Sequence, residues 1–182
     1  MSGEIQPGGH PPAPGRLALL QAFLNTHYDL AAGGGEVFDG AGMTRRWLLE
    51  RRLIAANAAV SDADVRRMLS VRETLRDLVA GRAVRRELTA LRPIVEIRLG
   101  PDQPRLEPVK TGTIDGAIAT LLAIVATEML TDRWSRLKVC PGEHCGWAFY
   151  DNSRNRSGRW CSMDVCGGRS KARAYYRRRR DE

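Results

Sequence analysis

Apolar residues recur three and four positions apart along much of the first 135 residues, which is the spacing of one face of an α-helix. Residues 94–99, with the sequence IVEIRL, break this pattern because they alternate in part and are rich in β-branched side chains, which favours a strand. The pattern predicts a mainly α N-terminal domain with a small β-hairpin. We expect its helices over residues 16–28, 44–54, 61–80, 83–91 and 113–129.

Two of the expected helices have start signals. Ser61 and Asp64 have the spacing of a capping box, in which each side chain accepts a hydrogen bond from the other residue's backbone. Thr113 is expected to cap the last helix, which is apolar on most sides and should be central to the core, with Met129 on its buried stripe. The arginine pairs along the helices are expected on solvent-exposed faces.

In the hairpin, Val95, Ile97 and Leu99 are expected to face inward, because alternate strand residues share a face. Residues 100–104 contain one Gly and two Pro, which suits a turn, and residues 105–110 can return as the second strand. Pro108 limits that strand to a sheet edge, because its nitrogen carries no hydrogen to donate.

Residues 1–15 are rich in Gly and Pro and offer little apolar surface to bury, so we expect a disordered tail there. No apolar run approaches the roughly 20 residues that span a membrane. The N-terminus also lacks the basic and apolar parts of a signal peptide. We therefore expect a cytoplasmic protein without membrane contact, and a reducing compartment disfavours disulfides.

All four cysteines form two pairs, each with four intervening residues, and fifteen residues separate the pairs. Two disulfides or four unrelated buried thiols are the alternatives to a metal site. The clustering in an otherwise cysteine-free chain favours a tetrahedral Zn²⁺ site, in which each pair binds one side of the ion. Four thiolates leave no open coordination position, so we expect one structural zinc ion and no enzyme. The expected ligands are Cys140, Cys145, Cys161 and Cys166.

The residues around the cysteines predict a treble-clef-like zinc module made of a knuckle, a hairpin and a helix. Pro141 and Gly142 permit the tight turn of the knuckle, and residues 147–150 are expected to form a short strand. Ser162 is expected to cap a final helix that carries Cys166 in its first turn. The aromatic residues expected to pack around the metal are Trp147, Phe149 and Trp160. Stacking on nucleic-acid bases is their alternative role.

Positive charge is concentrated in the same module. Residues 139–182 contain ten Lys and Arg against five Asp and Glu, whereas the first 138 residues contain nineteen against sixteen. This excess indicates a polyanionic partner. Positions 169, 173, 177 and 180 lie close to one helical face, where phosphate contact is the expected role and a solvated tail is the alternative. The candidate nucleic-acid contacts are Arg154, Arg156, Arg159, Arg169, Lys171, Arg173, Arg177 and Arg178.

The segment CPGEHCGWAFYDNSRNRSGRWCSMDVCGGR resembles the bacterial CGNR zinc-finger family in its spacing, aromatic residues and flanks. Phe23-Leu24-Asn25-Thr26 is similar to the segment that opens the helical ABATE domain, which this family joins to the finger. Gly168 departs from the pattern because the family has Asn there, whereas Arg169 is retained. The resemblance implies an ABATE-like domain over residues 16–135, a CGNR-like finger over residues 136–182, and a role in stress-related transcriptional regulation.

We therefore expect a DNA-binding transcriptional regulator, in which zinc holds the basic final helix for contact with double-stranded DNA. The N-terminal domain would mediate homodimer formation or sense a small-molecule effector. The alternative is a zinc-stabilised adaptor that binds protein or RNA without sequence-specific DNA binding.

Overall fold

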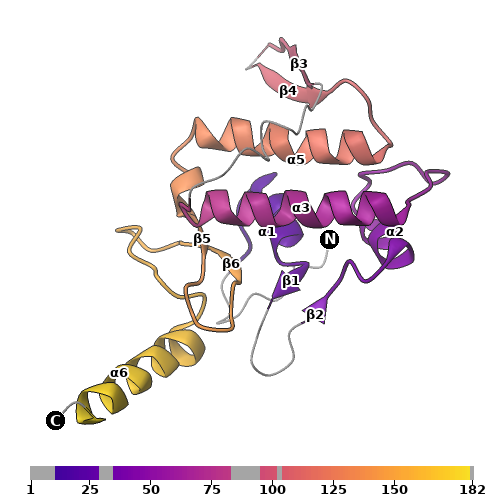
Figure 1. Cartoon of the computed structure of the whole chain (residues 1–182). Helices are drawn as coiled ribbons and strands as arrows, with labels where there is room; N and C mark the ends of the chain where they lie inside the picture. Colours follow the sequence, from indigo (N-terminus) through magenta and orange to yellow (C-terminus); the bar gives the residue numbers. More distant parts are fainter. Residues whose placement is uncertain (1–10, 29–34, 83–94, 102–103, 181–182) are drawn as a thin grey trace.

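The computed structural model describes residues 11–28, 35–82, 95–101 and 104–180. As predicted, the N-terminal part is mainly helical with small hairpins, and the C-terminal part gathers the four cysteines in one buried cluster (Figure 1). The helices are α1 (Leu17–Leu24), α2 (Ala41–Glu50), α3 (Asp62–Val79), α5 (Ile114–Met129) and α6 (Gly168–Arg180), with a 3₁₀ turn η2 (Trp134–Arg136) and a π turn η3 (Met163–Gly167). The strands pair in antiparallel twos: β1 (His27–Tyr28) with β2 (Gly35–Glu36), β3 (Val95–Arg98) with β4 (Arg105–Pro108), and β5 (Leu137–Val139) with β6 (Ala148–Tyr150).

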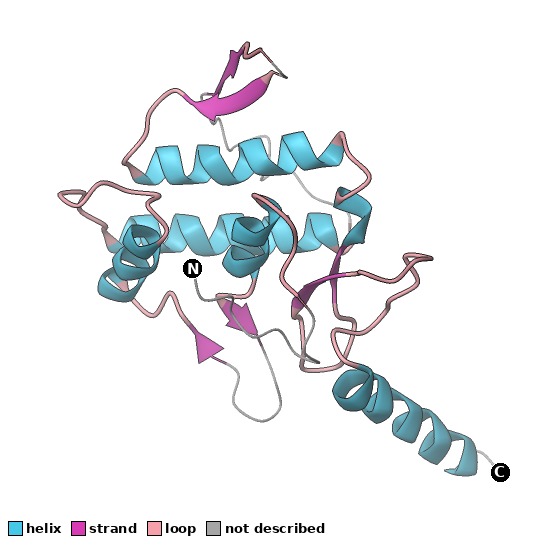
Figure 2. Cartoon of the chain, turned by 180° about the vertical axis from the view of Figure 1, so that it is seen from behind, coloured by secondary structure: helices cyan, strands magenta, loops and turns pink. Residues whose placement is uncertain are grey.

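The helices α3 and α5 lie side by side, and α1 packs against both (Figures 1 and 2). Their apolar faces meet in one core, as the helical spacing predicts. Three aromatic rings from α1, α2 and the loop before α2 close one side of this core, with ring centroids between 5.4 and 5.9 Å apart. These rings belong to Phe23, Phe38 and Trp47.

Both predicted helix starts are confirmed. The Ser61 hydroxyl accepts a hydrogen bond from the Asp64 amide at 3.2 Å, and the Ser61 amide donates to the Asp64 carboxylate at 3.0 Å. The Thr113 hydroxyl accepts from the Gly116 amide at 3.1 Å. Each side chain satisfies an amide that the first helical turn leaves without an internal partner, so these helices begin where the sequence predicts.

The helical core also includes residues of β5, which precedes Cys140, and of β6, which follows Cys145. Leu137, Ala148 and Tyr150 from β5 and β6 are buried in the same cluster as the helical residues. The strand β6 contacts α1, and β5 contacts α3. The hairpin that carries Cys140 at its end is therefore anchored on the helical part, and this anchoring positions the cysteine site.

The outer hairpin differs from the prediction. Its pairing is as expected, with Ile97 opposite Leu106, but Ile97 is 69% exposed and Leu99 is 87% exposed instead of facing inward. Of the three residues expected to face inward, only Val95, near the base of the hairpin, is half-buried. The hairpin projects above α5 (Figure 1), so no element of the described residues lies beyond its turn end. Met129, predicted to be buried, is 50% exposed because it is the last residue of α5.

Two helix bounds and one terminus also differ. The first helix ends at Leu24, and β1 follows where the prediction continues the helix to residue 28. The second begins at Ala41, after Gly40 with a φ of 90°, and ends at Glu50. In the expected disordered tail, Ala13 is buried and its amide donates to the Gln21 side chain at 2.7 Å. The helix predicted over residues 83–91 lies outside the described residues.

Candidate metal centre and nucleic-acid interface

The two cysteine pairs come together in space. All four residues are buried, none is in a disulfide, and their sulfur atoms lie within 4.8 Å of one another. The Cys145 and Cys161 sulfurs are 3.6 Å apart, and those of Cys161 and Cys166 are 3.7 Å apart. Zinc–sulfur bonds of about 2.3 Å in a tetrahedron place the sulfurs about 3.8 Å apart. The donor set and its spacing therefore fit a tetrahedral Zn²⁺ ion.

The first pair is held by a tight knuckle. The Cys145 amide donates to the Gly142 carbonyl at 3.1 Å, and the Cys140 amide donates to the Trp147 carbonyl at 2.8 Å. A methyl group on Gly142 would lie 3.3 Å from the Cys166 sulfur, so a side chain there would crowd the metal site. Gly146, with a φ of 62°, takes a left-handed conformation that suits glycine. These contacts confirm the predicted turn after Cys140.

The second pair is held by a capped turn. The Ser162 hydroxyl accepts from the Val165 amide at 3.3 Å, and its carbonyl accepts from the Cys166 amide at 3.0 Å. Ser162 is thus the predicted cap, but it opens the π turn η3, and α6 begins only at Gly168. Cys166 therefore lies directly before the basic helix and fixes its first turn to the metal site.

The thiols of Cys140, Cys145 and Cys161 share hydrogen bonds, which shift their pKa values in opposite directions. A hydrogen bond from the Cys145 thiol, with a second from Cys161, lowers the pKa of Cys140 to about 2. The Cys145 thiol donates its hydrogen to Cys140, which raises the pKa of Cys145 to about 12. A hydrogen bond from the Cys161 thiol to Cys140 likewise raises the pKa of Cys161. Zinc must displace the protons that remain, so its affinity is expected to rise with pH.

The aromatic residues of this region form a small core around the cysteines. Phe149 is buried against them, and Trp147 and Trp160 are partly buried there, as predicted. Trp147 also meets Tyr28 of β1 edge-on, with ring centroids 5.0 Å apart. The guanidinium of Arg159 lies over the Trp160 ring, 5.2 Å from its centroid.

A buried ion pair organises the loop between the two cysteine pairs. The Lys138 ammonium donates to the Asp151 carboxylate at 2.7 Å and to the carbonyls of Arg156 and Gly158 at 2.5 and 2.9 Å. Burial alone would raise the pKa of Asp151, but hydrogen bonds from Lys138 and from Ser153 lower it to about 2. The sequence analysis missed this pair, although Asp two residues before Ser is a common turn signal.

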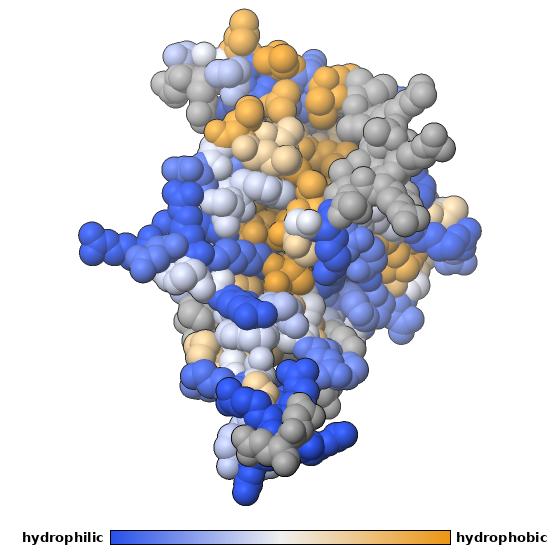
Figure 3. All heavy atoms as spheres, turned by 60° about the vertical axis from the view of Figure 1, so that its left-hand side comes forward, coloured by the Kyte–Doolittle hydropathy of each residue, from blue (hydrophilic) through white to orange (hydrophobic). Residues whose placement is uncertain are grey.

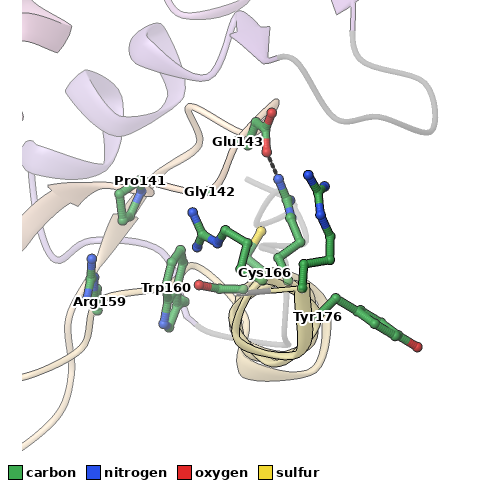
Figure 4. Close-up of a pocket in the computed structure, with 11 residues that line it drawn as sticks. Pro141, Gly142, Glu143, Arg159, Trp160, Cys166 and Tyr176 are labelled. Carbon is green, nitrogen blue, oxygen red and sulfur yellow. Dashed lines mark ion pairs between the residues drawn. The ribbon is translucent and has the colours of Figure 1, made fainter. Parts of the chain in front are cut away.

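The basic helix α6 extends away from the rest of the molecule (Figure 1), and none of its residues is buried. Hydrophilic side chains cover this end of the surface (Figure 3). Beside the helix, a groove of about 440 Å³ separates it from the knuckle and from Trp160 (Figure 4). Four arginines line the groove: Arg159, Arg173, Arg177 and Arg180.

The structure brings only some of the predicted nucleic-acid residues together. Arg159, Arg173 and Arg177 share the groove, whereas the predicted contacts Arg169, Lys171 and Arg178 are exposed on α6 outside its lining. Arg154 is exposed in the loop after β6. Arg156 lies 3.2 Å from Asp132 and bonds Ser135, so it is turned back toward the chain before β5.

Residues 136–179 match the CGNR zinc finger family, and residues 15–133 match the ABATE family, described as "Putative stress-induced transcription regulator". The chain belongs to the ABATE family. A four-cysteine cluster in a CGNR zinc finger indicates one zinc ion, which confirms the predicted cofactor. No curated protein matches the chain closely enough to count as a relative.

The ABATE part holds the CGNR finger through buried polar contacts that the sequence analysis missed. The Asn25 side chain pairs with both backbone groups of Ala148: its oxygen accepts from the amide at 2.7 Å, and its nitrogen donates to the carbonyl at 2.9 Å. The Gln21 amide donates to the same carbonyl at 3.2 Å. We call these residues, together with Arg76, the seam between the ABATE part and the finger. The one signal in the sequence is Asn25 in the FLNT segment, which resembles the family pattern but does not reveal a contact with Ala148.

Two single arginines of α3 are buried, which the sequence analysis did not predict, whereas the adjacent pair Arg66 and Arg67 is exposed as expected. Arg76 donates to the carbonyls of Gly146, Leu24 and His27, so it joins the knuckle to the end of α1. Arg72 forms a double ion pair with Glu36, with both distances 2.7 Å. Burial is tolerated because each guanidinium has fixed acceptors or a carboxylate nearby: the Arg76 Nε atom, which has no hydrogen-bond partner, lies 3.2 Å from the Glu73 carboxylate.

None of the helices in the described part of this ABATE protein combines the length and the apolar surface that crossing a membrane would take.

Proposed function

We propose that this ABATE protein is a DNA-binding transcriptional regulator, in which the four cysteines bind one structural zinc ion. The zinc site holds the start of α6, and α6 contacts the phosphates of double-stranded DNA. The family supports the regulatory role, since it is described as a transcription regulator. A four-thiolate site leaves zinc no open position for catalysis, so the metal would act through structure alone.

The observation that carries the proposal is the surface of α6. Seven of its thirteen residues are Lys or Arg, and none is acidic. Like charges three or four positions apart destabilise a helix by about 0.2–0.5 kcal/mol per pair. The helix has no buried residue to offset this repulsion. A partner with dense negative charge would supply the missing stabilisation, which is the role that we assign to DNA.

Duplex DNA suits the geometry of an extended helix. An α-helix with its side chains is about 10–12 Å wide, close to the roughly 12 Å width of the major groove. Arginine also presents a planar fork that pairs with phosphate at two points. The residues that we propose as phosphate contacts are Arg159, Arg169, Lys171, Arg173, Arg177 and Arg178.

The test uses the full zinc-loaded chain and fluorescence anisotropy with duplex DNA at several salt concentrations. Duplex affinity should fall steeply with salt because bound counterions are released. Arg177→Gln should weaken binding and lower the salt slope by about one. Arg66→Gln makes the same change in charge at an exposed position of α3 and should have no such effect. Selection from genomic fragments would then identify a preferred sequence.

A specific observation favours a second candidate, the adaptor that binds RNA. Tyr175 and Tyr176 of α6 are 49% and 66% exposed, and the half-buried Trp160 lines the same groove as Tyr176. Exposed aromatic rings can stack on unpaired bases. Tighter binding to single-stranded RNA than to duplex DNA, without an enriched DNA sequence, would favour this function over the first.

The cytoplasmic location, the small-molecule effector and the homodimer expected from the sequence stay predictions. Size-exclusion chromatography with light scattering would test the homodimer on the same zinc-loaded protein.

A further inference from the structure

The groove between the knuckle and α6 contains a marked imbalance of charge. Four arginines line it, and Glu143 is the one carboxylate among its described lining residues. Figure 4 shows Glu143 above α6 and Trp160 to one side of the helix. Four thiolates and one Zn²⁺ ion would add a net charge of −2 beside Cys166. The four arginines still exceed this charge and that of Glu143, so the groove stays suited to a further anion.

The carboxylate of Glu143 is engaged with this cationic lining. It forms an ion pair with Arg173, which joins the knuckle to α6 across the groove (Figure 4). Both side chains stay accessible, at 63% exposed for Glu143 and 44% for Arg173. An exposed pair of this kind contributes only about 0–1 kcal/mol, so a second anion can displace it at little cost.

Carboxylate and phosphate compete for the same partner, because each offers two oxygens to the fork of a guanidinium. We propose that the groove is a phosphate-binding site for the nucleic-acid backbone, and that Glu143 occupies Arg173 in the free protein and thereby limits affinity. This inference rests on the proposed function and deepens it. It assigns a contact with the nucleic-acid backbone to Arg173. Glu143 is then the residue that competes with phosphate for Arg173.

The test compares Glu143→Gln with Asp39→Asn, which removes the same charge at an exposed position in the loop before α2. With the full zinc-loaded chain, Glu143→Gln should raise duplex affinity about twofold to fivefold. Asp39→Asn should change it much less. In an Arg173→Ala background the gain from Glu143→Gln should shrink, because the competition that it relieves no longer exists. Circular dichroism and zinc content serve as controls for folding.

An equal effect of the two substitutions on duplex affinity would overturn the inference. A gain that persists in full without Arg173 would also overturn it. In either case DNA binding by the wild-type chain would leave the proposed function intact.

A second measurement separates the inference from the proposed function. Inorganic pyrophosphate is titrated into each protein, and the NMR signals of the arginine side-chain N–H groups are followed. If the wild-type chain binds no duplex DNA, the proposed function is wrong. Tighter pyrophosphate binding by Glu143→Gln than by Asp39→Asn would then still support the phosphate site, and equal binding would overturn it.

Discussion

Gly168 shows how a single residue can depart from a family pattern without disturbing the site. Its φ of −61° and ψ of −47° are ordinary helical values, so no left-handed conformation requires glycine there. A methyl group at this position would meet nothing closer than the Met163 carbonyl oxygen, at 3.6 Å. The position at the start of α6 therefore has room for the Asn of the family pattern, and its side chain would be exposed.

We predict that Gly168→Ala stabilises the protein by about 0.4–1 kcal/mol, because alanine restricts the unfolded chain and fits the native backbone. Thermal unfolding of the zinc-loaded chain measures this change. Gly142→Ala is the contrasting variant, and should weaken zinc binding because its methyl group would crowd Cys145 and Cys166. A destabilised Gly168→Ala protein would show that α6 does not begin in the conformation described.

Asp151 shows how one buried carboxylate fixes a loop. Besides Lys138, it accepts hydrogen bonds from the Ser153 and Gly158 amides, at 2.9 and 2.8 Å. We predict that Asp151→Asn costs about 1–3 kcal/mol at neutral pH, because the buried donors lose a charged acceptor. Urea unfolding at pH 7 measures the loss.

The difference in unfolding free energy between wild type and Asp151→Asn should change with pH in a direction that the pKa of Asp151 determines. The pKa of Asp151 is about 2 in the folded protein, below the ordinary value of about 3.9 in an unfolded chain. Its stabilising effect should therefore be complete above about pH 5 and should disappear as the pH falls from about 4 toward 2. Acid release of zinc affects both proteins, so the measurement is the difference between wild type and Asp151→Asn. A difference that grows toward low pH would contradict this prediction.

At the scale of elements, α6 differs from the other described helices because it lacks a buried face. The helices α1, α3 and α5 derive stability from apolar faces in the core. The start of α6 contacts η3, where Cys166 belongs to the metal site. Its distal half has four consecutive arginines at 177–180. The negative C-terminal end of the helix and a contact of Arg179 with the Tyr175 ring, 5.6 Å from its centroid, offset part of this charge.

We predict that the amides of residues 173–180 exchange rapidly with solvent in the free protein and become protected on binding duplex DNA. The reason is that phosphates neutralise the repulsion that frays the distal helix. Hydrogen–deuterium exchange with mass spectrometry measures the exchange rates of these amides with and without DNA, and the amides of α3 serve as the internal reference. Strong protection of residues 173–180 without DNA would contradict the prediction.

At the scale of the whole molecule, the seam and the shared core make the two parts depend on each other. The residues of β5 and β6 are buried with the helical core, and Asn25 and Arg76 bind the backbone of the knuckle. Ala148 is fully buried, so its amide and carbonyl have no access to water if Asn25 is removed. Metal binding and the folding of the ABATE part are therefore expected to be coupled.

We predict that Asn25→Ala lowers the melting temperature and weakens zinc binding, with a loss of about 1–3 kcal/mol. The loss comes from the Ala148 amide, which loses its acceptor, whereas the Ala148 carbonyl still accepts from Gln21. Asn57→Ala, at an exposed position, is the matched control. A chelator should also speed amide exchange in α1 of the wild-type chain. Zinc removal that unfolds the finger while α1 and α3 keep their protection would show that the parts fold independently.

The sequence by itself determined the features that depend on neighbouring residues. The caps at Ser61, Thr113 and Ser162 act within a few residues of the amides that they satisfy, so local spacing was sufficient to find them. The cysteine spacing likewise indicated the zinc site, because tetrahedral thiolate coordination needs two close pairs. The helical character of the N-terminal part followed from the apolar periodicity.

Only the tertiary structure decided which polar residues are buried and what they hold. Asn25 meets Ala148 across 123 positions of the chain, and Arg76 meets Gly146 across 70, so no local pattern distinguishes them from solvated side chains. The 69% exposure of Ile97 depends equally on tertiary packing, because none of the described elements lies above the hairpin. Burial and long-range pairing depend on how the elements pack, and that packing is a property of the whole chain.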